Sequence, residues 1–207
     1  AIDNITGGAT AALGDIDVSG FTADNLTTMV EKVTSGATSA LGSISMTGYT
    51  SDNLSSMVEK VAAGATGALG KIVMDNYTSA DLSGMMEKVT AGATGALGNI
   101  DMTGYNASHL SGMASKITAG ATGALGNIQM TGFSADNLSS MVEKVTAGAT
   151  GALGSIELAS GATRAGKIST DDFSADNLSS MVEKIAAGAT GALGKIVMDN
   201  YTSADLS

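Results

Sequence analysis

The chain has 207 residues, of which 28 are glycine and 12 are methionine, and it contains no cysteine, proline or tryptophan. The absence of cysteine excludes disulfides, a thiol nucleophile and cysteine-ligated metals, and the single histidine excludes a histidine-rich zinc site. Ten basic against twenty acidic residues give a formal net charge of −10, which argues against nucleic acid and anionic lipid as partners.

The dominant feature of the sequence is an internal repeat of 28 residues. The dipeptide Leu-Gly recurs with this spacing at Leu13, Leu41, Leu69, Leu97, Leu125 and Leu153. The next Leu-Gly, at Leu193, follows after 40 residues, which is one repeat plus 12. The spacing predicts a single repeat array over residues 1–207, with about seven units that begin and end mid-unit. It also predicts an irregular 12-residue insertion near residues 157–170.

Each unit carries one helix-start signal. The residue after an aromatic side chain is a threonine, serine or asparagine, all of which are good N-caps. A leucine follows four positions later, which is the spacing of a hydrophobic staple with the aromatic residue. From two successive units we single out these structural cap and staple residues: Tyr49, Thr50, Leu54, Tyr77, Thr78 and Leu82.

Apolar residues then recur at intervals of three and four, which predicts a helix over about residues 52–69. We interpret Gly64 and Gly67, which fall inside this helix, as positions where a neighbour packs closely. The polar residues fall mostly outside the apolar face, and we expect them to be exposed to solvent: Ser55, Ser56, Glu59 and Lys60.

The segment between helices shows a different pattern. Isoleucine and methionine alternate with a period of two at Ile44-x-Met46, Ile72-x-Met74, Ile100-x-Met102 and Ile128-x-Met130, as in a short strand. A helix of this length and an extended return segment each span roughly 27 Å. The pattern therefore predicts an α/β solenoid with one short parallel strand and one helix per unit. The alternative is an all-α repeat array of antiparallel helices joined by loops.

Two resemblances follow from these residues. The spacing Leu69-x-x-Ile72-x-Met74 loosely resembles the strand half of leucine-rich repeats. The nearly identical, small and threonine-rich units resemble the long arrays of bacterial surface proteins of the adhesin or hemagglutinin-like type. The second resemblance implies an extracellular or cell-surface location and a role in a fibre.

The insertion contains Arg164, the only arginine of the chain. We expect it to lie in a turn between two short strands, Ile156–Leu158 and Lys167–Thr170. Such an exposed loop is a candidate binding position, and a tolerated deletion within one unit is the competing interpretation.

The chain shows no catalytic pattern, and we predict that it is not an enzyme and needs no cofactor. His109 occupies a capping position that holds Asp or Asn in other units, so we interpret it as a substitution in a helix cap and not as an acid–base or metal-binding residue. Asp75 and Asp199 precede helix starts and could bind calcium as carboxylate ligands, but no recognised ligand spacing accompanies them. We therefore predict neither a catalytic nor a metal site.

Two functional hypotheses remain. The first is a structural module of an extracellular bacterial fibre or adhesin, which provides length and self-association. The second is a binding solenoid that presents a repeated surface to a protein or glycan. No run approaches 18 apolar residues, so we expect no membrane insertion. Neither end carries a polar capping unit, so we expect end-to-end association into filaments.

Overall fold

The computed structural model describes residues 20–43, 48–69, 78–101, 105–124, 134–153, 156 and 174–193. The α-helices are α2 (Ala23–Ala40), α3 (Ser51–Leu69), α4 (Ser79–Ala96), α5 (Ala107–Ala124), α6 (Ala135–Leu153) and α7 (Ala175–Leu193). Short 3-10 turns, η2 (Leu41–Ser43) and η3 (Leu97–Asn99), continue α2 and α4. Each repeat unit within the described residues thus contributes one helix.

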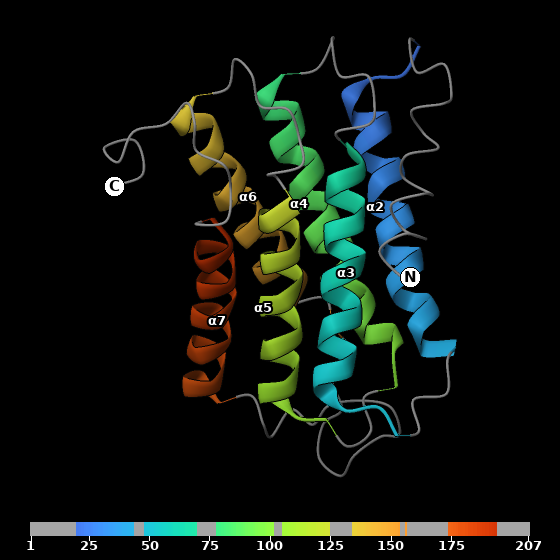
Figure 1. The fold of residues 1–207 in the computed structure, drawn as a ribbon, viewed down its shortest axis with the longest axis vertical. Coiled ribbons are helices and arrows are strands. Elements are labelled where there is room, and N and C mark those ends of the chain that lie inside the picture. The colour runs from blue at the N-terminus through green and yellow to red at the C-terminus, as the bar shows by residue number, and fades with distance from the viewer. Residues whose placement is uncertain are drawn as a thin grey trace.

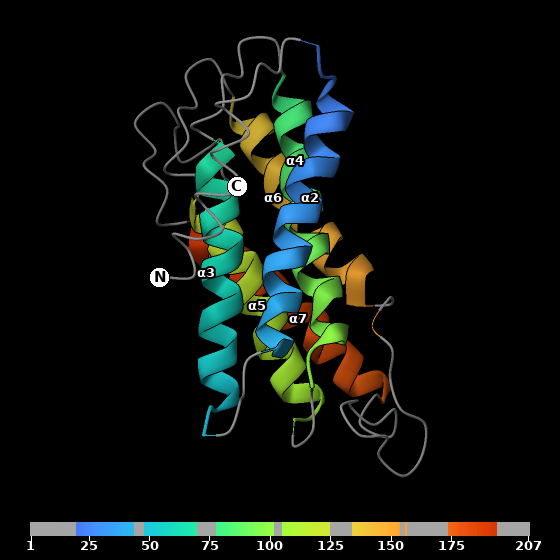
Figure 2. The same ribbon diagram turned by 90° about the vertical axis from the view of Figure 1, so that its right-hand side faces the viewer.

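The helices form two layers. One layer contains α2, α4 and α6, and the other contains α3, α5 and α7 (Figures 1 and 2). Consecutive helices run in opposite directions, so all helices of one layer are parallel (Figure 1). Each helix packs most extensively against the helix two units away, in its own layer, and much less against the next helix in the chain.

The predicted α/β solenoid is therefore wrong. Within the described ranges there is no strand, and the regular structure is entirely helical. A helix-and-strand coil would place successive helices parallel on one side of a sheet, whereas here they alternate in direction and layer (Figure 1). The alternative, an all-helical array of antiparallel helices, describes the fold. Most of the segments predicted as strands lie outside the described residues, and Ile100 lies buried in a bend just after η3.

The helices begin at the expected capping residues and continue through the glycines. The α3 helix runs from Ser51 to Leu69, so Gly64 and Gly67 are both helical. Each such glycine costs a helix about 1 kcal/mol relative to alanine. Packing between helices must offset this cost, because the isolated sequence does not favour a helix at these positions.

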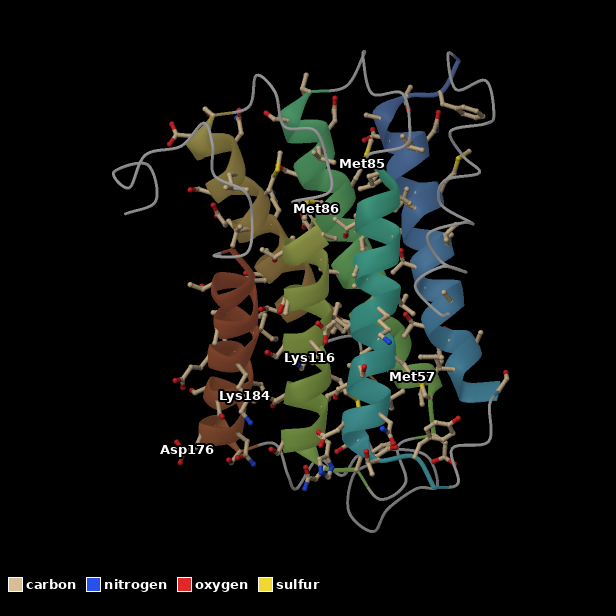
Figure 3. All side chains as sticks on the ribbon, viewed as in Figure 1. Met57, Met85, Met86, Lys116, Asp176 and Lys184 are labelled. Carbon is tan, nitrogen blue, oxygen red and sulfur yellow. The ribbon has the colours of Figure 1, made fainter. Side chains whose placement is uncertain are left out.

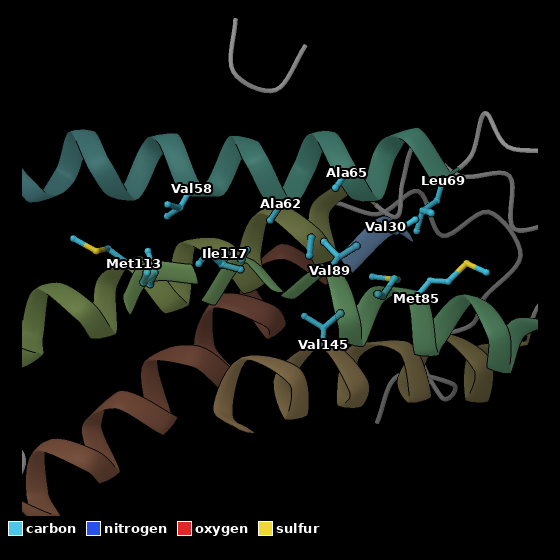
Figure 4. Close-up of a cluster of buried hydrophobic side chains, with 14 of the residues drawn as sticks. Val30, Val58, Ala62, Ala65, Leu69, Met85, Val89, Met113, Ile117 and Val145 are labelled. Atoms are coloured by element: carbon cyan, nitrogen blue, oxygen red, sulfur yellow. The ribbon is translucent and has the colours of Figure 1, made fainter. Parts of the chain in front are cut away.

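Burial divides each helix into two side faces. The face toward the next helix of the layer, here called the forward face, comprises Ser55, Val58, Ala62 and Thr66 in α3, all buried. The face toward the preceding helix of the layer, here called the backward face, comprises Met113, Ile117, Gly120 and Ala124 in α5, all buried. Apolar side chains from both layers meet in one large core (Figure 4), and Ala114, Ala149 and Ile185 form a second, smaller cluster.

The forward face corrects one expectation from the sequence. Ser55 was predicted to be exposed, but it is only 8% exposed, and the equivalent Ser83 and Ser111 are 3% exposed. In α6 and α7, the corresponding Ser139 and Ser179 are exposed. Burial of this serine therefore follows from the presence of a helix two units further along.

Candidate functional site: the repeating interface within each layer

The interface between parallel neighbours is built around one glycine per helix. A Cβ atom added at Gly92 of α4 would lie 2.9 Å from the carbonyl oxygen of Glu31 in α2. At Gly120 and Gly148 an added Cβ would overlap the carbonyl oxygens of Glu59 and Glu87. Real Cβ atoms do not approach backbone oxygens so closely, so the packing requires glycine at these positions. The sequence spacing from carbonyl to glycine is the same in all three pairs, which fixes one register for the array.

A threonine hydroxyl lies beside this contact. A Cβ at Gly148 would lie 2.7 Å from Thr90 Oγ1, and one at Gly188 would lie 2.9 Å from Thr118 Oγ1. Thr118 Oγ1 lies 3.2 Å from the carbonyl oxygen of Ile185 and 2.8 Å from that of Ser115. With one proton, the hydroxyl donates to one of these carbonyls at a time. When the hydroxyl donates to the Ile185 carbonyl oxygen, the hydrogen bond joins α5 to α7.

An ion pair borders the interface in two places. Lys116 Nζ lies 3.7 Å from Glu59 Oε2, and Lys144 Nζ lies 3.6 Å from Glu87 Oε2. These side chains are one-third to one-half exposed, so each pair contributes at most about 1 kcal/mol. Lys184 occupies the same position on α7 as Lys116 on α5 (Figure 3), but α5 carries Ser115 in place of glutamate.

Small residues leave a groove on the outside of each layer. A groove of about 450 Å³ crosses α2, α4 and α6, with Gly95 and Ala147 in its lining and Glu31 and Glu87 beside them. A second groove of about 530 Å³ crosses α3, α5 and α7, with a similar lining of alanine and glycine. These grooves follow directly from the glycine interface, because the residues that allow close packing also lack side chains to fill the outer surface.

The capping residues predicted from the sequence do form local hydrogen bonds. Thr50 Oγ1 accepts from the backbone N–H of Asn53 at 3.2 Å, and the Asn53 side chain accepts from the N–H of Thr50 at 2.9 Å. Thr78 and Asp81 form the same reciprocal pair in α4. These contacts satisfy N–H groups that have no partner within a helix.

The staple residues have mixed environments. Leu54 is fully buried and Leu82 is 3% exposed, whereas Tyr49 is 44% exposed. Tyr77 and Arg164 lie outside the described residues. The caps of α3 and α4 lie at opposite ends of the helices, so they stabilise individual helices and do not converge on one site (Figure 1).

His109 also has a capping role. Its Nδ1 accepts from the backbone N–H of Asn106 at 3.1 Å, and the Asn106 side chain accepts from the N–H of His109 at 3.0 Å. The imidazole contacts the Tyr105 ring edge-to-face, with ring centroids 5.7 Å apart. The histidine thus replaces the asparagine or aspartate of other units in the same pair of hydrogen bonds.

The described residues include no group of three or more histidine, aspartate or glutamate side chains placed to hold a metal ion. A search of the same residues for helices long and apolar enough to cross a membrane finds none.

The fold and interface define a two-layer helical repeat array. No known family model matches the sequence, and no curated protein matches it.

The sequence indicated packing glycines but not their partners. The glycine of one unit meets a carbonyl two units away, and nearly identical units look equally suitable for any neighbour. The best available signal was the set of small or β-branched polar residues at buried positions, such as Ser55 and Thr66 in α3. Their spacing of three and four from Val58 and Ala62 continues a second packed face.

Proposed function

We propose that the chain is a structural repeat module whose function is to build an extended, regular array. The observation that carries this proposal is the recurrence of one interface in both layers. The same glycine-to-carbonyl contact joins α2 to α4, α3 to α5, α4 to α6 and α5 to α7.

This interface makes the array extendable. Each unit contacts neighbours through the same backbone atoms and nearly the same side chains, so another unit adds the same contacts again. Among the described residues that differ between units, His109 lies at a helix start, Ser115 at an interface border, and Met86 and Ala114 are buried. A protein that binds one defined ligand would need a distinctive group of surface residues, and in the described helices His109 and Ser115 do not form such a group.

We propose further that the array belongs to an extracellular or cell-surface bacterial fibre or adhesin. This part rests on the resemblance of the small, threonine-rich units to arrays of that kind. The absence of cysteine and the acidic composition are compatible with it. In this setting the module would supply length and the capacity for self-association.

Small-angle X-ray scattering on residues 1–207 and on a tandem duplication tests the proposed function. The proposal predicts that the maximum dimension increases in proportion to the number of units, while the cross-sectional radius of gyration stays constant. A duplication that folds back on itself, with a larger cross-section and little gain in length, would contradict it.

The outer grooves favour a second candidate, a binding array for a protein or glycan. Substitution of Ala91 and Ala147 by glutamine would fill the groove across α2, α4 and α6 without adding charge. A glycan-array signal that this double variant loses would support binding, and a signal that it retains would remove the groove as the binding surface.

A further inference from the structure

The two ends of the described array expose opposite halves of the repeating interface. On α7, the forward face is uncovered: Val182 is 45% exposed, and Ala186 and Thr190 are exposed. In α3 the same positions are Val58, Ala62 and Thr66, and all three are fully buried against the layer. The nearby Leu178 is 47% exposed, whereas its equivalents in the other described helices are buried.

The backward face of α2 is uncovered in the complementary way. Gly36 is exposed, and a Cβ added there would meet nothing within 4 Å. The equivalent Gly120 and Gly148 are buried against carbonyl oxygens of the preceding helix. Val33 and Met29 beside Gly36 are half-buried, whereas their equivalents in α4 and α5 are fully buried.

Charges at the two ends also match. Glu183 on α7 is exposed at the position that Glu59 and Glu87 use for their ion pairs. Lys32 on α2 is exposed at the position of their partners, Lys116 and Lys144. The exposed glycine, the apolar residues and the charge of α2 therefore match the exposed backbone, the apolar residues and the charge of α7 in the way that neighbouring helices match within a layer.

We propose that the forward face of α7 binds the backward face of α2 in a second copy of this chain. In the complex, Gly36 of the second copy would lie against the carbonyl oxygen of Glu183, and Lys32 would pair with the Glu183 side chain. This inference rests on the proposed function, since it supplies the contact by which a structural array would lengthen beyond one chain.

The geometry permits the contact although α2 and α7 belong to different layers. Successive helices alternate in direction and layer and use one interface in both layers, so half a turn about the array axis exchanges the layers (Figure 1). After that rotation, α2 of the second copy runs parallel to α7. The contact is heterologous and leaves a free face at each end, so it propagates into linear oligomers rather than closing as a dimer.

Sedimentation velocity on residues 1–207, from low to high micromolar concentration, tests the inference. The wild type is expected to form a concentration-dependent series of linear oligomers. Gly36→Ala is expected to weaken association at least tenfold, because its methyl group would meet the backbone of α7. Val182→Glu is expected to do the same by placing a carboxylate in the apolar contact.

The matched control is Gly84→Ala. Gly84 is also helical with nothing within 4 Å of an added Cβ, but it lies in α4, away from both ends. Gly84→Ala is expected to associate like the wild type. Both alanine variants are expected to melt at or above the wild-type temperature as monomers, which excludes misfolding as the cause of any loss.

A mixing experiment makes the test directional. Gly36→Ala retains an intact α7 face and Val182→Glu retains an intact α2 face, so the two variants together are expected to form a dimer and nothing larger. A wild type that stays monomeric throughout, or association that both variants retain, would overturn the inference. The covalent duplication is measured at a concentration where single chains are monomeric, so it can extend even when free ends do not associate, and failure of the inference is distinguishable from failure of the proposed function.

Discussion

Helices α5 and α7 share a sequence pattern but differ in burial. In α5 both side faces are covered, and Ala114, Thr118 and Thr122 are buried on the side toward α7. In α7 the equivalent positions are exposed, and the buried residues Met181, Ile185 and Ala192 lie on the side toward α5 or the core. The comparison teaches that burial in this protein is a property of neighbours two units apart, not of the helix sequence alone.

The largest expected difference between the two helices concerns the first-turn leucine. Leu110→Ala should lower the free energy of unfolding by about 2–5 kcal/mol, because it removes a fully packed side chain and leaves a cavity. Leu178→Ala should change it by no more than about 0.5 kcal/mol, since Leu178 is 47% exposed. Urea denaturation at a concentration where the chain is monomeric measures both. Equal losses would contradict the difference in packing.

The next contrast compares two glycines at one repeat position. Gly148→Ala should destabilise the chain by roughly 1–3 kcal/mol, since the methyl group overlaps the Glu87 carbonyl and forces the helices apart. Gly36→Ala should stabilise it by up to about 1 kcal/mol, because alanine favours the helix and meets nothing. Thermal unfolding of the two variants shows directly whether each substitution raises or lowers the melting temperature. Stabilisation by both would show that α4 and α6 do not pack through this glycine.

The helix caps, unlike the leucine and glycine positions, should contribute equally to a central helix and to α7. Thr78→Ala in α4 and Ser174→Ala in α7 each remove an oxygen that accepts a backbone N–H at 3.2 Å. Each should cost about 1 kcal/mol, because capping acts within a single helix. Circular dichroism during denaturation would measure the losses. A much larger loss at Thr78 would indicate that the cap depends on the neighbouring helices.

The smallest expected effect is the ion pair. A double-mutant cycle on Lys116 and Glu59 should give a coupling of about 0.2–1 kcal/mol that decreases with added salt. The same cycle on Lys184 and Ser115, the equivalent positions between α7 and α5, should give no coupling because serine carries no charge. A substantial coupling in the second cycle would show that the two interfaces are equivalent despite the serine.

Local features of the fold could be predicted from the sequence. The repeat period follows from the Leu-Gly spacing, and the α3 bounds, Ser51–Leu69, lie within a residue of the predicted helix. Both depend on interactions within one unit, such as the cap at Thr50 and the apolar spacing through Leu69. These signals are repeated in every unit, which makes them easy to recognise.

The arrangement of the units was not predictable in the same way. The alternation of isoleucine and methionine favoured strands, but at Ile100 the burial comes from a bend that packs on the core. Whether a helix packs mainly on the next helix or on the one after it depends on contacts such as that of Gly120 with the Glu59 backbone. Because the units are nearly identical, no single unit reveals which neighbour it prefers.

A cysteine cross-link tests the central claim that each unit packs on the unit two positions away. A Cβ added at Gly95 would lie 3.9 Å from Ala152 Cβ, within the range of about 3.5–4.5 Å that disulfides span. The chain has no native cysteine, so Gly95→Cys with Ala152→Cys introduces a single pair. Oxidation of the monomer should produce a complete intramolecular disulfide, identified by mass spectrometry of the linked peptides. Failure of this pair, together with efficient linkage of Gly95→Cys to Ala124→Cys in the adjacent unit, would contradict the two-layer array.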